Sequence, residues 1–315
     1  MIHAAYLAKG LSAMSKAHRV NTMAGHLGAA VVAGYFIGEQ HPDLDERVYS
    51  GIKGELDRII CGESVFSPKK EASFPVAEMF ELWPKEQPME NLVDGIAEAL
   101  ATNIDQTRES GHNVIFAAIA IRALKDHSDL ATPSVTEGIA KLIAGFNGAK
   151  PGSGYFGKEL GRIDGRQISL PNDRDFPPYA TLQEMACVVI DELIQHANTR
   201  RDGFGGLWHI INHAAALAEL SAYGYRELAT MGLAAHHQHL RLFRAVPDMT
   251  DELGVDAPAD HDPRTSAFWA STSIRRDRAR LDHRIKTLYG FDTLIGLVKD
   301  EQKRDLANEK LRYLM

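Results

Sequence analysis

Three histidines stand at the start of apolar segments that share one sequence frame. They are His26, His112 and His209, and the steps between them are 86 and 97 residues. Neutral imidazoles that converge in a cavity can bind zinc, iron, manganese or copper. An open fourth position would make such a site catalytic. We therefore expect these rings to ligate a divalent transition metal.

Further polar residues recur at fixed distances from these histidines. His213 follows His209 by four residues, which places both rings on one helical face and lets them share an ion. Asp105 precedes His112 by seven residues, and Asp202 precedes His209 by seven. A carboxylate at such a position can orient an imidazole or act as a general base. The predicted metal ligands are His26, His112, His209 and His213, and the predicted catalytic residues are Asp105 and Asp202.

The pattern of apolar residues predicts how these histidines are positioned. Small apolar residues fill 21–39, so the helix expected there is buried on most sides. Residues 43–60 follow with one apolar stripe, which indicates an outer, one-sided helix. The same pairing recurs at 111–125 with 132–146 and at 207–222 with 226–243. Repeated inner and outer helices predict an all-α, α/α toroid-like helical repeat, with linking helices between its three copies.

The remaining segments complete this prediction. Further helices are expected at 3–17, 76–82, 90–104, 180–197, 266–288 and 294–314. We expect residues 1–247 to form the toroid and 248–315 to form a C-terminal helical extension on the same domain. The charged run 275–280 predicts an exposed face or a contact between copies of the chain, as in a homo-oligomer. His236, His237 and His239 predict a solvent-facing side of an outer helix.

Residues 147–178 form the longest stretch without a periodic pattern. Loops of this length are often functional lids, and a plain insertion is equally compatible with the pattern. Tyr155 and Lys158 are predicted to contact substrate from this loop. Glu159 follows Lys158 where a phosphate-binding loop needs Ser or Thr. The chain has no nucleotide cofactor motif of the Rossmann or phosphate-loop type.

Composition restricts the class of protein. The 315 residues are 44% hydrophobic and 24% charged, as expected for a globular protein with a substantial core. The net charge of −7 argues against a dedicated nucleic-acid binder. Cys61 and Cys187 form no disulfide framework or zinc knuckle. No apolar run approaches the roughly 18 residues of a membrane span, and no signal peptide is recognisable. We expect a cytoplasmic protein that binds neither membrane nor nucleic acid.

One helix also resembles a known family. The segment Trp208-His209-Ile210-Ile211-Asn212-His213-Ala214-Ala215 is similar to the histidine-rich helices of questin oxidase-like proteins. The similarity covers this helix and its two shorter relatives, and the chain is shorter than most members. The resemblance implies an oxygenase that acts on aromatic, polyketide-like molecules.

The leading hypothesis is a metal-dependent enzyme that acts on a small organic molecule in a central cavity. One alternative is a metal-free α/α-barrel lyase or epimerase of carbohydrate type, with histidine and tyrosine as acid and base. Another is a non-enzymatic helical-repeat binding scaffold. Bound metal favours the first hypothesis, and an open cavity with Tyr155 beside the histidines favours the second. A filled centre with outward-pointing histidines favours the third.

Overall fold

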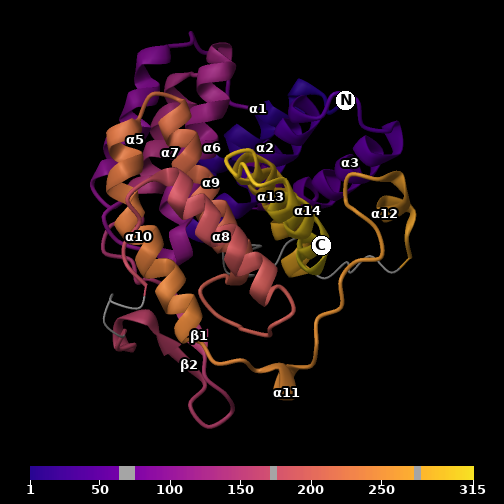
Figure 1. Ribbon diagram of the computed structural model, residues 1–315. Helices are drawn as coiled ribbons and strands as arrows, with labels where there is room; N and C mark the ends of the chain where they lie inside the picture. Colours follow the sequence, from indigo (N-terminus) through magenta and orange to yellow (C-terminus); the bar gives the residue numbers. More distant parts are fainter. Residues whose placement is uncertain (64–74, 171–175, 273–277) are drawn as a thin grey trace.

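The computed structural model describes residues 1–63, 75–170, 176–272 and 278–315, and its regular structure is almost entirely helical (Figure 1). The predicted all-α class is confirmed, whereas the toroidal repeat stays a prediction. The helices are α1 Ala4–Ala17, α2 Gly25–Gln40, α3 Glu46–Ile60, α4 Val76–Met79, α5 Asp94–Ala101, α6 His112–Asp126, α7 Pro133–Ala144, α8 Leu182–His196, α9 Gly206–Ala222, α10 Arg226–Ala245, α11 Thr250–Leu253, α12 Ser266–Ala270, α13 Arg278–Ile295 and α14 Glu301–Leu311.

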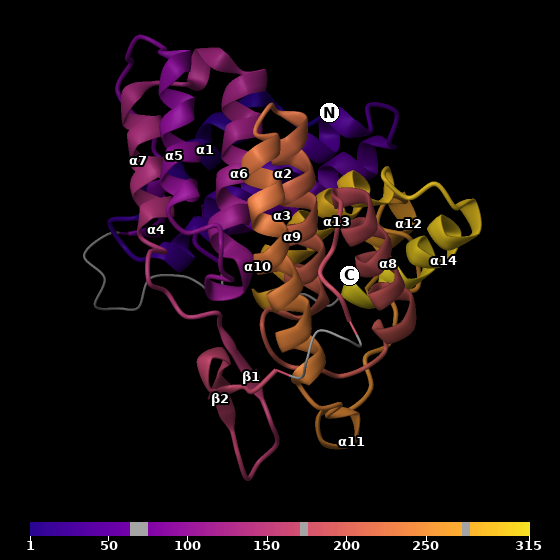
Figure 2. The same ribbon diagram turned by 60° about the vertical axis from the view of Figure 1, so that its left-hand side comes forward.

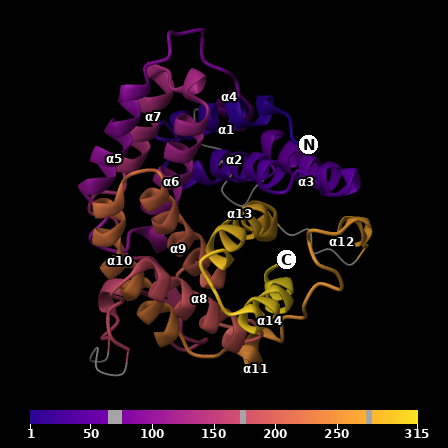
Figure 3. The same ribbon diagram turned by 45° about the horizontal axis from the view of Figure 1, so that its top comes forward.

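Four helices form the centre of the molecule. Helix α2 packs on α6, α6 on α9, α9 on α13, and α13 again on α2, so the order of contacts closes on itself (Figure 3). Helices α1 and α3 cover α2 from outside, α5 and α7 cover α6, and α8 and α10 cover α9. The main apolar core fills the space between these inner and outer helices.

Helix α13 differs most from its prediction. Residues 280–290 are buried, although the charged run 275–280 at the start of this helix predicts an exposed face or a contact between copies of the chain. The buried Arg284 guanidinium donates two hydrogen bonds to the Glu55 carboxylate, both at 2.9 Å. A paired and hydrogen-bonded charge can be buried where an isolated one cannot. Residues 275–277 of the predicted contact between copies lie outside the described residues.

The inner helices run in the same direction, as contacts three turns beyond the histidines show. Arg122 stands ten residues after His112, and Glu219 ten residues after His209. The Arg122 guanidinium donates to the Glu219 carboxylate at 3.0 Å and lies 4.0 Å from the centre of the Phe36 ring on α2. On α13, the Tyr289 hydroxyl donates to Glu219. Positions that are equivalent in the repeat therefore meet at equal heights.

Left-handed turns start two of these helices. Residues 109–111 before α6 have positive φ angles, and so do residues 204–206, which end at the first residue of α9. Gly205 has a φ of 72°, and a Cβ atom there would lie 1.5 Å from His209 Nδ1. Gly111 has a φ of 84°, and a Cβ atom there would lie 2.6 Å from the His213 ring. Glycine thus permits the backbone turn and also leaves room for a histidine ring.

The irregular stretch predicted at 147–178 contains a small hairpin. Strand β1 (Ser153–Tyr155) pairs antiparallel with β2 (Arg162–Asp164), with Gly154 opposite Ile163. Figure 2 shows this hairpin projecting beyond the helices, near the end of α10.

Two predicted boundaries in the C-terminal part are corrected. The helix expected over 266–288 is interrupted, because α12 ends at Ala270 and Ser271 has extended backbone angles. The last helix begins at Glu301 instead of residue 294. The Asp300 carboxylate caps this start by accepting a hydrogen bond from the Lys303 backbone amide. Within the described ranges, every helix is either too short or too polar to span a bilayer.

Candidate metal centre

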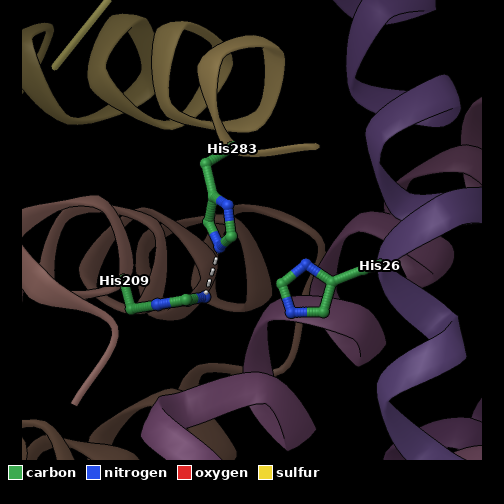
Figure 4. Close-up of side chains that lie close together, drawn as sticks. All are labelled: His26, His209 and His283. Atoms are coloured by element: carbon green, nitrogen blue, oxygen red, sulfur yellow. Dashed lines mark hydrogen bonds between the residues drawn. The ribbon is translucent and has the colours of Figure 1, made fainter. Parts of the chain in front are cut away.

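Four buried histidine rings meet where the inner helices begin. His26, His112, His209 and His283 come from α2, α6, α9 and α13 and are called here the four-histidine layer. Their side chains are at most 5% exposed. The centre of the His26 ring lies 4.4 Å from that of His112, 5.7 Å from that of His209 and 5.1 Å from that of His283. Figure 4 shows His26, His209 and His283 turned toward a common point.

The spacing of the ring nitrogens is compatible with a metal ion. His26, His209 and His283 each offer one nitrogen, and these atoms lie within 4.8 Å of one another. The Nε2 atoms of His209 and His283 are 3.3 Å apart. A tetrahedral zinc ion with Zn–N bonds of about 2.0–2.1 Å requires about 3.3–3.4 Å between two ligand nitrogens. His112 completes the layer, because its Nε2 contacts the Nε2 of His26.

Burial favours the uncharged form of three of these rings. Desolvation lowers the pKa of His26, His112 and His209 well below the ordinary value of 6.5. The charge of Lys286 lowers the pKa of His26 and His112 further. Neutral imidazole is the form that binds metal, so these three rings are in the form required for ligation at neutral pH.

Neighbouring groups orient the rings. His112 Nδ1 donates to the backbone carbonyl of Glu109, which leaves its Nε2 lone pair free to face His26. The Lys286 amine forms a hydrogen bond with His26 Nδ1. Desolvation lowers the pKa of Lys286 to about 7. The Trp208 ring stacks on His283, with 5.0 Å between ring centres.

Sequence reasoning identified three members of this layer and missed one. His26, His112 and His209 meet as predicted, but His213 lies in another group of rings. His283 was not predicted, because it stands in a charged segment that lacks the repeat frame. One signal was present: His283 follows His209 by 74 residues, a step similar to the two earlier ones.

The other predicted site residues lie elsewhere in the structure. Asp105 is exposed. Asp202 is 46% exposed and pairs with Arg162 at 2.6 Å. Tyr155 lies on the hairpin, where its hydroxyl donates to Glu252 at 2.5 Å, and Lys158 is exposed. The structure therefore does not bring these four side chains to the buried four-histidine layer.

A second histidine group consists of His213, His236 and His239. All three are fully buried, so the predicted solvent-facing side of α10 is wrong. His239 Nε2 donates to the Phe204 carbonyl at 2.8 Å, and His236 Nε2 donates to the Ile210 carbonyl at 3.0 Å. His239 Nδ1 must then accept, so His213 Nδ1 donates to it at 3.2 Å. Burial lowers the pKa of His236 to about 3 and that of His239 to about 4.

A small cavity lies between the four inner helices, with a volume of about 20 Å³. Its wall includes Lys286, which contacts the His26 ring, and it reaches Glu219 and Tyr289 further along the helices. The cavity therefore adjoins the four-histidine layer on the side toward the helix interiors.

Comparison with known proteins gives no assignment. No protein-family model, curated protein or solved structure matches this chain. The resemblance to questin oxidase-like proteins stays a prediction.

Proposed function

We propose that His26, His209 and His283 bind one divalent transition metal ion, with His112 as the fourth ring of the set, and that the protein is a metal-dependent enzyme acting on a small organic molecule. The observation that carries the proposal is the convergence of three buried ligand nitrogens within 4.8 Å. An ion held this way would supply Lewis-acid activation of a bound group.

The arrangement of the ring nitrogens in the layer is compatible with a bound cation. The Nε2 atoms of His26 and His112 face each other, and so do those of His209 and His283. One N–H···N hydrogen bond can account for each pair taken alone, but it does not account for the nitrogens of three rings lying within 4.8 Å of one another. A cation satisfies the lone pairs of several such nitrogens together. An all-imidazole set favours zinc, iron or copper over manganese.

Metal analysis of the purified protein tests this proposal. We expect close to one zinc, iron or copper ion per chain in the wild type. His283→Ala removes a ligand and should lose the metal, whereas His213→Ala removes an equally buried ring outside the layer and should retain it. A wild type that binds none of these ions would overturn the proposal. That result would leave the lyase and scaffold hypotheses.

A further inference from the structure

The cavity beside the four-histidine layer has a regular relation to it. Its wall includes Ala29, Ile115, Asn212 and Lys286, and each stands three residues after one of the four histidines. Three residues correspond to a rise of about 4.5 Å along a helix. The cavity thus lies within one helical turn of the rings, in the space enclosed by the four inner helices.

The size of the cavity decides what can occupy it. A water molecule needs at least about 10–15 Å³ and two to four polar partners. The cavity offers about 20 Å³, and Asn212, Glu219, Lys286 and Tyr289 supply polar atoms to its wall. An organic substrate does not fit into this space. One water molecule does.

One polar atom in this wall has no partner in the described part of the chain. Asn212 is 5% exposed, and its Oδ1 atom is buried without a hydrogen bond. An unsatisfied buried acceptor costs about 1–3 kcal/mol. A water molecule in the cavity would satisfy this oxygen by donating to it.

A glycine keeps the space beside this oxygen open. Gly290 lies within α13, where glycine costs about 1 kcal/mol relative to alanine. A Cβ atom at this position would lie 2.5 Å from Asn212 Oδ1. Glycine at position 290 therefore lowers the stability of the helix but leaves room next to the buried Asn212 Oδ1 atom.

We propose that this cavity binds one water molecule, held by Asn212 Oδ1, and that this water is the second reactant of the metal centre. The role as reactant rests on the proposed metal function; the water site itself does not. The reaction class is then hydrolysis or hydration. In hydrolysis the water oxygen bonds to the substrate as the bond from the substrate to its leaving group breaks, and the proton lost by the water ends on the leaving group. In hydration the oxygen and the proton of the water add to the two atoms of a double bond.

High-resolution crystal structures of the metal-free and zinc-loaded protein test the site. We expect a density peak within hydrogen-bonding distance of Asn212 Oδ1 in both forms. Gly290→Ala fills the space, and Asn212→Leu removes the acceptor at similar volume, so either variant should lose the peak and keep its zinc content. Gly54→Ala is the control, because it is also a helical glycine but has no atom within 4 Å of the added Cβ.

Several outcomes would contradict the water site. An empty cavity in the wild type, or a peak that persists in Asn212→Leu, would overturn it. The Asn212 variant keeps the test valid if Gly290→Ala fails to fold. If zinc does not bind while the peak is present, the metal function fails and the water site stands alone.

A solution experiment tests the connection to the metal. With cobalt(II) as a spectroscopic probe, fluoride can replace a bound water molecule, and the change should appear in the visible spectrum. We expect the change in the visible spectrum on adding fluoride to be at least tenfold smaller for Gly290→Ala than for the wild type. Equal responses in the two proteins would overturn the proposed role of the cavity water at the metal centre.

Discussion

The two histidine groups lie close together and serve as a comparison for each other. His209 and His213 belong to the same helix, four residues apart, and both are buried. In the second group the N–H groups of His236 and His239 point to backbone carbonyls. In the four-histidine layer, Nε2 atoms point at one another. Burial alone therefore does not distinguish the two groups. The second group has one direct contact between imidazole nitrogens, from His213 Nδ1 to His239 Nδ1, whereas nitrogens of three rings converge in the four-histidine layer.

Of the changes considered, acidification should have the largest effect on the free energy of unfolding. His236 and His239 have pKa values of about 3 and about 4 in the folded protein, against 6.5 ordinarily. Between pH 6.5 and 4.5 the unfolded chain binds protons that the folded protein excludes, so stability falls as the pH falls. Each histidine should cost about 2.5 kcal/mol at pH 4.5 relative to pH 7. Urea unfolding at both pH values measures this loss.

The double variant His236→Gln, His239→Gln isolates the contribution of the second group. It should lose about 5 kcal/mol less than the wild type between pH 7 and 4.5. Between pH 7 and 8 the two proteins should change alike, because these rings are neutral in both states. An equal loss of stability on acidification would show that the second group is not kept neutral by burial.

Two adjacent glycines test how the four-histidine layer is oriented. Gly205 and Gly206 both have positive φ angles, but only at Gly205 would a Cβ atom overlap His209. Gly205→Ala should reduce zinc affinity by about 10–100-fold, as disturbed ligand orientation does. Gly206→Ala should cost only the backbone strain, about 1–2 kcal/mol. Zinc competition with a chelator, together with thermal unfolding, separates the two effects, and equal zinc affinities would refute the role given to Gly205.

The smallest effect is expected at His237, outside the second group. Its Nε2 donates to the Phe176 carbonyl at 2.9 Å, and its ring packs on the Phe176 ring. His237→Gln should cost about 1 kcal/mol or less and leave zinc affinity unchanged. Urea unfolding and zinc titration measure both quantities. A change in zinc affinity would show that the surroundings of α10 are coupled to the metal centre.

Helix positions could be predicted from the sequence because most helices carry a single clear apolar pattern. Residues 43–60 have one stripe, and α3 occupies 46–60. The same reasoning did not predict the burial of helix α13. Its charged residues indicate a surface helix, but Arg284 is paired with Glu55, which is 229 residues away in the sequence. A pairing partner so distant cannot be identified from local periodicity.

The histidines of the candidate site could be predicted where they share the repeat frame, and could not be predicted elsewhere. His26, His112 and His209 share that frame and meet. The spacing of His209 and His213 predicts a common helical face, but it does not reveal that α10 supplies His239 as the partner of His213. Asp202 keeps the predicted spacing from His209, yet the left-handed turn at Gly205 lies between them.

The contact between α2 and α13 has a consequence for biosynthesis. Helix α2 ends at Gln40, and its neighbour α13 begins only at Arg278. At about 5–20 residues per second on the ribosome, the first inner helix waits on the order of 10–50 s for the last. Until residues 278–295 have been synthesised, the side of α2 that α13 covers in the folded protein has no α13 to pack against. Another part of the chain, or a chaperone, is therefore expected to cover this side of α2 during synthesis.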